Sequence, residues 1–88
     1  MYYVYILESL KDKNFYTGYT NNLRKRFEEH SKGLVASTKS RRPFKLIYYE
    51  TYLNERDAER REKYLKTGMG KRDLRNRLKG YLEDDRKV

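Results

Sequence analysis

The clearest chemical signal in this sequence is a helical face that carries an arginine and a histidine. Leu23, Arg26, Phe27 and His30 follow one another at the i, i+3, i+4, i+7 spacing of one side of an α-helix. A surface helix normally fills that side with apolar residues, and His30 is the only histidine of the chain. Burying an arginine or a histidine costs free energy unless it finds partners. The pattern therefore indicates two polar groups that face the core for a functional reason.

Two tyrosines are expected on one face of a β-hairpin that precedes this helix. Residues 2–8 and 15–19 are rich in Tyr, Val, Ile and Phe, which favours two strands, and the polar segment between them favours a turn. In the expected register Tyr5 lies opposite Gly18, and Tyr16 lies diagonally from Tyr5 on the same face. Because glycine leaves space there, the two phenols would share one surface.

A carboxylate interrupts the apolar face of a second predicted helix. Residues 44–52 predict a third strand, and Asn54 begins a helix that extends to about Lys66 and stops at Gly68. The apolar stripe of that helix would include Ala58, residue 62 and Leu65. Residue 62 is glutamate, so a carboxylate is expected on the side that packs.

The remaining segments complete a small α+β fold. The first helix begins at Asn21 or Asn22 and ends at Gly33, and residues 34–43 form a loop. A third amphipathic helix is expected from Lys71 onward, followed by a charged tail over residues 84–88. We therefore expect one domain over residues 1–83, with a three-stranded antiparallel sheet flanked by three helices in the order β-β-α-β-α-α.

These polar residues form a set suited to phosphodiester hydrolysis. A tyrosine or His30 can exchange a proton with water, Arg26 can neutralise charge that grows on phosphoryl oxygens, and Glu62 can hold a divalent ion. The structural alternative is that the buried tyrosine hydroxyls are simply satisfied and that Arg26 pairs with Glu62. The residue types alone leave both interpretations open.

Composition points to a polyanionic partner. The 88 residues contain 22 Lys and Arg against 13 Asp and Glu, a net charge of +9, which favours nucleic acid first and an anionic membrane second. A basic surface with no partner is the third possibility. The chain has no cysteine, which excludes disulfides and thiolate metal sites. The first residues do not resemble a signal peptide and no apolar run is long enough to span a membrane, so we expect a cytoplasmic protein.

The order of these motifs resembles the GIY-YIG nuclease superfamily over about residues 2–78. Its first tripeptide corresponds to Tyr3-Val4-Tyr5 and its second to Tyr16-Thr17-Gly18, with Arg26 eight residues after Gly18 and His30 one helical turn later. The chain is most similar to small stand-alone members. It departs from the motif at Tyr3, which replaces a glycine, and at Thr17, which replaces an isoleucine.

This resemblance implies a role for each matched residue. Tyr5 and Tyr16 would act in proton transfer, Arg26 would stabilise the phosphoryl transition state, and His30 would be a second polar or proton-transfer group. Glu62 would be the single metal-binding carboxylate, holding Mg²⁺ or Mn²⁺. The family often has an asparagine that orients the substrate, and Asn76 is the candidate here.

The resemblance also implies an endonuclease that acts on DNA. No appended DNA-recognition domain is expected in these residues, although such domains give the family's repair and homing enzymes their affinity and target choice. Phosphate contacts would then come from exposed cations, which grip the backbone without reading sequence, so specificity would be weak or structure-based. The cations are Lys39, Arg41, Arg42, Lys66, Lys71, Arg72 and Arg75.

Two other functions remain open at this stage. The first is a noncatalytic nucleic-acid-binding module with the same fold, which could act on RNA. The second is an interaction protein whose exposed tyrosines contact a partner. The sequence also leaves the oligomeric state open.

Overall fold

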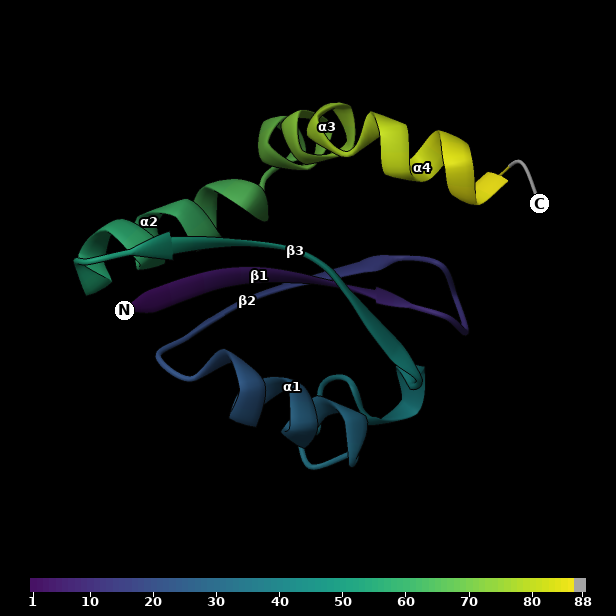
Figure 1. Ribbon diagram of the computed structural model, residues 1–88, viewed down its shortest axis with the longest axis horizontal. Helices are drawn as coiled ribbons and strands as arrows, with labels where there is room; N and C mark the ends of the chain where they lie inside the picture. Colours follow the sequence, from purple (N-terminus) through teal and green to yellow (C-terminus); the bar gives the residue numbers. More distant parts are fainter. Residues whose placement is uncertain (87–88) are drawn as a thin grey trace.

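Residues 1–86 fold into three strands and four α-helices, with one short 3₁₀ turn (Figure 1). The computed structural model describes residues 1–86, and side chains as far as residue 84. In chain order the elements are β1 Tyr2–Ser9, β2 Phe15–Thr20, α1 Leu23–Ser31, the 3₁₀ turn Lys39–Arg41, β3 Phe44–Tyr52, α2 Glu55–Leu65, α3 Gly68–Arg77 and α4 Lys79–Arg86.

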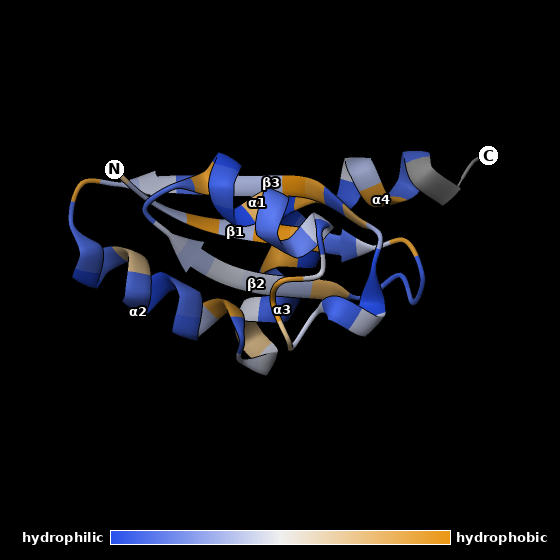
Figure 2. Ribbon diagram, turned by 90° about the horizontal axis from the view of Figure 1, so that it is seen from below, coloured by the Kyte–Doolittle hydropathy of each residue, from blue (hydrophilic) through white to orange (hydrophobic). Residues whose placement is uncertain are grey.

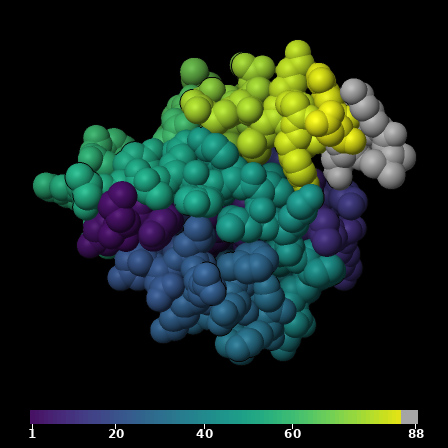
Figure 3. Space-filling model, in the orientation of Figure 1, coloured from purple at the N-terminus to yellow at the C-terminus, as the bar shows by residue number. Residues whose placement is uncertain are grey.

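The strands form one antiparallel sheet in the order β2-β1-β3, with helices on both faces. Figure 1 shows α1 on one face and α2, α3 and α4 on the other. The same layers are visible in Figure 3, where α1 is blue and the two last helices are green and yellow. The α+β class and the three-stranded antiparallel sheet are confirmed.

The two sides of β1 contribute to two separate cores because side chains alternate along a strand. Val4 and Ile6 pack with Ala58, Leu65 and Leu74 under α2 and α3. On the opposite face, the second core contains Tyr5, Leu7 and Phe44, with Tyr16, Leu23, Phe27 and Leu46 packed against it. In Figure 2 the apolar residues of the strands are orange, while the helices are mostly blue. The helix α1, which carries Arg26 and His30, therefore packs against the second core through Leu23 and Phe27.

The hairpin has the register that the sequence predicts. Tyr5 pairs with Gly18, and Leu7 pairs with Tyr16. A Cβ atom added at Gly18 would lie 2.5 Å from the Tyr5 hydroxyl oxygen and 2.6 Å from its Cζ. Gly18 therefore lets the Tyr5 ring lie across the edge strand β2.

The predicted ends of α1 are confirmed. The Asn22 side chain caps the helix by accepting a hydrogen bond from the Lys25 backbone N–H at 3.1 Å. Gly33 follows the last turn with φ of 76°, the left-handed conformation that glycine adopts without strain. These two signals fix the length of the helix that carries Arg26 and His30.

The prediction of one helix from Lys71 onward is wrong, because the structure has two helices there. Thr67 begins α3 by accepting a hydrogen bond from the Gly70 backbone N–H at 3.1 Å. Gly70 also packs so closely against the Tyr64 carbonyl that a Cβ atom would overlap it. Gly70 therefore permits a tight α2–α3 connection.

The chain turns again at Leu78, and α4 follows as far as Arg86. The charged tail expected over residues 84–88 is thus helical through Arg86, and residues 87–88 lie outside the described part. The single domain over residues 1–83 stays a prediction. Within the described residues, none of the helices has the length and apolar content needed to cross a membrane.

Candidate active site

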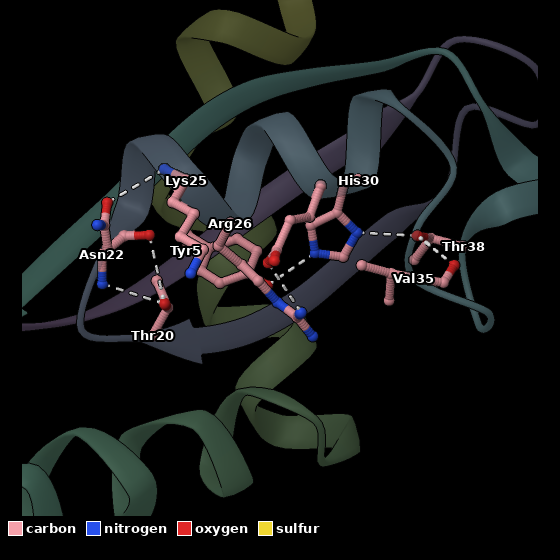
Figure 4. Close-up of polar contacts among 9 residues, drawn as sticks. Tyr5, Thr20, Asn22, Lys25, Arg26, His30, Val35 and Thr38 are labelled. Atoms are coloured by element: carbon pink, nitrogen blue, oxygen red, sulfur yellow. Dashed lines mark hydrogen bonds and ion pairs between the residues drawn. The ribbon is translucent and has the colours of Figure 1, made fainter.

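The centre of the site is a buried hydrogen-bonded chain of Tyr5, His30 and Thr38 (Figure 4). The Tyr5 hydroxyl lies 2.8 Å from Nε2 of His30, and Nδ1 of His30 lies 2.8 Å from the Thr38 hydroxyl oxygen. Tyr5 is 1% exposed and the other two residues are 0% exposed. The imidazole is therefore held between two hydroxyl groups away from solvent.

Burial keeps both titratable members of this chain neutral at neutral pH. It lowers the pKa of His30 to about 4. The nearby Arg26 charge also lowers this pKa, and the Glu29 charge raises it by a smaller amount. It raises the pKa of Tyr5 to about 12, although Arg26 partly opposes that shift. The pair thus holds a phenol proton beside an uncharged imidazole.

Arg26 is the positive charge next to this pair. Its Nη1 donates to Oε1 of Glu29 at 3.3 Å, and its side chain is 37% exposed. Burial lowers the pKa of Arg26, but contacts with Tyr5 and Glu29 outweigh burial and raise it. The guanidinium lines a polar hollow of about 270 Å³ whose other walls are Tyr19, Thr20, Asn21, Asn22, Lys25 and Glu29. A cation at the wall of an open hollow is suited to meet an anionic ligand.

Tyr16 packs against the same imidazole. Its ring centroid is 5.1 Å from that of His30, with an interplanar angle of 62°, and 6.4 Å from that of Tyr5. Tyr16 is half-buried, whereas Tyr5 is buried. The two motif tyrosines therefore share one surface as predicted, but differ in access to solvent.

Glu62 lies on the side of α2 that faces β2. Glu59, one turn earlier, accepts a hydrogen bond from the Tyr19 hydroxyl of β2 at 3.3 Å, and i, i+3 residues share one helix side. The Glu62 charge also contributes to the raised pKa of Tyr5. The side chain is 16% exposed and pairs with Lys66 Nζ at 3.0 Å. The carboxylate thus interacts electrostatically with Tyr5.

The structural alternative, a pairing of Arg26 with Glu62, is not found. Arg26 pairs with Glu29 on its own helix, and Glu62 pairs with Lys66 on its own. Both pairs are made within one helix and include a substantially exposed cation. Such pairs contribute little to stability, so the structure gives neither Arg26 nor Glu62 a strong structural reason to be there.

The donor set at Glu62 fits a magnesium-type ion rather than zinc. Within residues 1–84, no group of three His, Asp or Glu side chains is placed to hold a metal. Zinc sites use three or four protein ligands, whereas Mg²⁺ keeps several waters and is bound through one or two carboxylates plus substrate phosphates. Glu62 offers one partly exposed carboxylate whose charge acts on Tyr5, which fits the second requirement.

The cations of the loop after α1 are partly occupied by protein contacts. Arg41 Nε donates to Asp12 at 2.7 Å. This hydrogen bond lowers the pKa of Asp12 to about 2, although burial acts in the opposite direction. Arg42 Nε donates to the Lys39 carbonyl at 3.0 Å. Lys39 itself is exposed. The loop therefore offers less free charge than its composition suggests.

The cations of α3 lie on two sides of that helix. Lys71 and Arg75 line a hollow of about 180 Å³ with Thr17 of β2, next to the edge strand that Tyr5 crosses. Arg72 and Asn76 line a different hollow with residues of α2, α3 and α4, and Arg75 lines this second hollow as well. Asn76 is exposed there, and the structure does not bring it to the Tyr5–His30 pair.

Glu29 and Thr38 belong to the site although the sequence did not single them out. Glu29 could have been found, because it lies three residues after Arg26 on the same helix. Thr38 had no such signal, since it comes from a loop whose path depends on tertiary contacts. The hydrogen bond to Nδ1 of His30 is what identifies it.

Comparison with known proteins identifies the family of this chain. Residues 1–76 match the GIY-YIG catalytic domain family. The chain is 51% identical to a UPF0213 protein of Clostridium perfringens over 67 residues, covering 75% of this chain and 71% of the relative. It is 38% identical to a UPF0213 protein of Bacillus licheniformis over 87 residues, covering 98% and 84%.

A solved structure shares this fold. The solution NMR structure of a UPF0213 protein from Bacillus halodurans has a TM-score of 0.53 and 36% identity, covering 84% of this chain and 82% of that one. The family match spans far more than half of the 88 residues and includes the strands and helices that position Tyr5, Arg26, His30 and Glu62. The chain therefore belongs to the GIY-YIG family.

Proposed function

We propose that this protein is a divalent-metal-dependent endonuclease that hydrolyses phosphodiester bonds in DNA with weak or structure-based specificity. The observation that carries the proposal is the 2.8 Å contact of a buried phenol with a neutral imidazole, beside a partly exposed guanidinium. A structural polar cluster has no need for an open cation next to it. Hydrolysis of a phosphodiester needs both a group that accepts a proton and a fixed positive charge.

The Tyr5–His30 pair would remove the proton from the attacking water. Tyr5 holds its proton at neutral pH, so it can accept a second one only as it passes the first to Nε2 of His30. A pKa of about 4 keeps His30 unprotonated, although it also makes the imidazole a weak base. The charge of a bound phosphate would raise that pKa and strengthen His30 as the acceptor.

Arg26 would bind the phosphoryl group. Its planar guanidinium can donate to two oxygens at once, which suits the extra charge that these oxygens carry in the transition state. Glu29 holds the guanidinium at 3.3 Å and orients it toward the hollow. Lys25, on the wall of the same hollow, would contact a neighbouring phosphate.

Glu62 would hold the divalent ion, Mg²⁺ or Mn²⁺. Such an ion, when bound, polarises a phosphoryl oxygen and stabilises the leaving oxygen. Lys66 would then have to give up its contact with Glu62, and as an exposed side chain it is free to turn toward phosphate. Lys71 and Arg75 lie along the same edge of the sheet and would contact the DNA backbone.

A cleavage assay on defined DNA tests this proposal. Branched, nicked and single-stranded DNA, with RNA as a further substrate, are incubated with Mg²⁺, Mn²⁺ or chelator. We expect metal-dependent cleavage of at least one DNA that Glu62→Gln abolishes without loss of thermal stability, because that carboxylate has no buried partner. Glu59→Gln, one turn earlier on the same side of α2, is the matched control and should keep cleaving.

Two outcomes would overturn the proposal. Salt-sensitive binding with no cleavage under any of these conditions would identify a noncatalytic nucleic-acid-binding module instead. Cleavage that persists in Glu62→Gln would remove the metal assignment, since a site with one carboxylate cannot lose it and still hold the ion.

A further inference from the structure

We propose that Thr38 is a positioning residue that fixes the tautomer of His30 and thereby leaves Nε2 free to accept the Tyr5 proton. This inference rests on the proposed function, in which Tyr5 and His30 move a proton. It concerns a residue of the loop after α1 that touches neither the polar hollow nor its cation.

The hydroxyl of Thr38 has only one proton, and the structure provides an acceptor for it. Thr38 Oγ1 lies 3.4 Å from the Val35 carbonyl oxygen and 2.8 Å from Nδ1 of His30. A carbonyl can only accept, so a hydroxyl that donates to Val35 must accept from Nδ1–H. A neutral imidazole carries one proton on its two nitrogens, and with that proton on Nδ1, Nε2 is a bare acceptor.

The direction of the whole chain follows from this assignment. With Nε2 bare, the contact at 2.8 Å must be donated by the Tyr5 hydroxyl. The opposite arrangement would place the imidazole proton on Nε2, and Tyr5 would then be the acceptor. His30 could not take a proton from Tyr5 in that arrangement. The position of one hydroxyl proton at Thr38 therefore decides whether the pair can work as a relay.

The backbone around Thr38 holds the hydroxyl in place. Val35 accepts hydrogen bonds from the backbone N–H groups of Thr38 at 3.1 Å and Lys39 at 3.0 Å, which closes a tight turn. The Thr38 carbonyl in turn accepts from the Arg41 N–H at 2.9 Å. Thr38 is 0% exposed, so water does not compete for Nδ1.

The other groups around the imidazole do not take this role. Tyr16 and Phe44 present ring edges, with centroids 5.1 and 6.1 Å from that of His30. Arg26 and Glu29 lie on the same helix as His30 and pair with each other. Within the described part of the chain, Thr38 is the group that the structure places against Nδ1.

The test uses the fact that His30 is the only histidine, so the imidazole ¹⁵N spectrum reports on one ring. In the full chain without nucleic acid at neutral pH, we expect the shift of a protonated Nδ1 and an unprotonated Nε2. Thr38→Val removes the hydroxyl at similar volume and should shift the proton toward Nε2. Thr38→Ser keeps the hydroxyl and should restore the wild-type pattern.

Cleavage gives the second readout. Thr38→Val should lower the rate by about 10- to 100-fold, the size of effect that loss of an orienting partner has on a metal-bound histidine, while Thr38→Ser recovers most of it. DNA binding should be unchanged in both variants because Thr38 is buried.

Each result decides the inference. A wild-type ring protonated on Nε2 would overturn it, and this measurement stands even if Thr38→Val does not fold. An unchanged tautomer in folded Thr38→Val would also overturn it. The expected tautomers without cleavage of any DNA would support the Thr38 assignment and count against the nuclease function, so the two failures are distinguishable.

Discussion

Two of the polar networks that contain tyrosines differ in the group at their centre. At the β3–α2 contact, Glu50 accepts hydrogen bonds from the hydroxyls of Tyr48 and Tyr52, each at 2.6 Å, and from Arg61 at 3.0 and 3.1 Å. There a carboxylate is surrounded by donors and neutralised by a cation. In the other network, the neutral imidazole of His30 on α1 lies between the hydroxyls of Tyr5 and Thr38. The neighbouring cation, Arg26, stays partly exposed.

The comparison shows that a shifted tyrosine pKa does not by itself identify a proton-transfer group. Burial raises the pKa of Tyr52 to about 12 with help from the Glu50 charge, and burial raises the pKa of Tyr5 to the same value against the opposing Arg26. Tyr52 donates to an acceptor that is already compensated by Arg61. Tyr5 donates to an imidazole that can bind a further proton, so only Tyr5 has somewhere to send one.

The largest expected difference between the networks is in catalysis. Tyr5→Phe should lower DNA cleavage by about 10²- to 10⁴-fold, the usual effect of losing a general acid or base. Tyr48→Phe, the matched change in the Glu50 network, should leave cleavage unchanged but lower the free energy of unfolding by about 1.5–3 kcal/mol, because a hydrogen bond to a charge is lost. Cleavage rates and urea unfolding of both variants test this pair. Equal activity of Tyr5→Phe and wild type would break the comparison.

The next effect is on stability as the pH falls. The pKa of His30 is about 4 in the folded chain and about 6.5 when unfolded, so between these values only the unfolded chain binds the proton. The uncharged imidazole of His30 thus contributes fully to the free energy of unfolding above pH 6.5. This contribution is lost as the pH falls toward 4, which lowers the free energy of unfolding by about 3 kcal/mol.

The Glu50 network should respond in a lower pH range. The Arg61 and tyrosine hydrogen bonds outweigh burial and lower the pKa of Glu50, so its contribution persists to below the ordinary value of 4.5. Urea unfolding at pH 7, 5.5 and 4.5 separates the two networks, because His30→Gln should remove the upper transition only. A wild-type protein equally stable at pH 7 and 4.5 would contradict the buried neutral imidazole.

The sequence predicted the strands better than the contacts between elements. Alternation and the turn signal placed Tyr5 opposite Gly18, since a hairpin register depends on local geometry. The sequence left open whether Arg26 pairs with Glu62, because pairing across elements depends on how α2 crosses the sheet, and the structure instead pairs Arg26 with Glu29. The loop that brings Thr38 to His30 carries no periodic pattern, so its path could not be inferred.

A smaller effect should follow from the space that Tyr5 needs. Gly18→Ala would place a methyl group 2.5 Å from the Tyr5 hydroxyl oxygen, so the ring must shift, at a cost of about 1–3 kcal/mol in unfolding free energy. Gly68→Ala is the control, because nothing lies within 4 Å of a Cβ there. Thermal melts and cleavage rates should show both a less stable and a less active Gly18→Ala. If that variant is as stable and as active as Gly68→Ala, the placement of Tyr5 over Gly18 is wrong.

The smallest expected effect concerns the basic loop. If Lys39, Arg41 and Arg42 all bound phosphates, changing them to Ala would flatten the slope of log affinity against log salt by about three units. We expect the slope to change by about two units at most, because the Arg41 charge is already paired with Asp12 at 2.7 Å. The slope is measured by DNA-binding titrations from low to moderate salt, with Arg60→Ala as a control from the hollow beside Tyr52, where no DNA contact is expected. A full three-unit change would show that DNA displaces Asp12 from Arg41, whereas an unchanged slope would exclude the loop from the binding face and leave that role to Lys71 and Arg75 along β2.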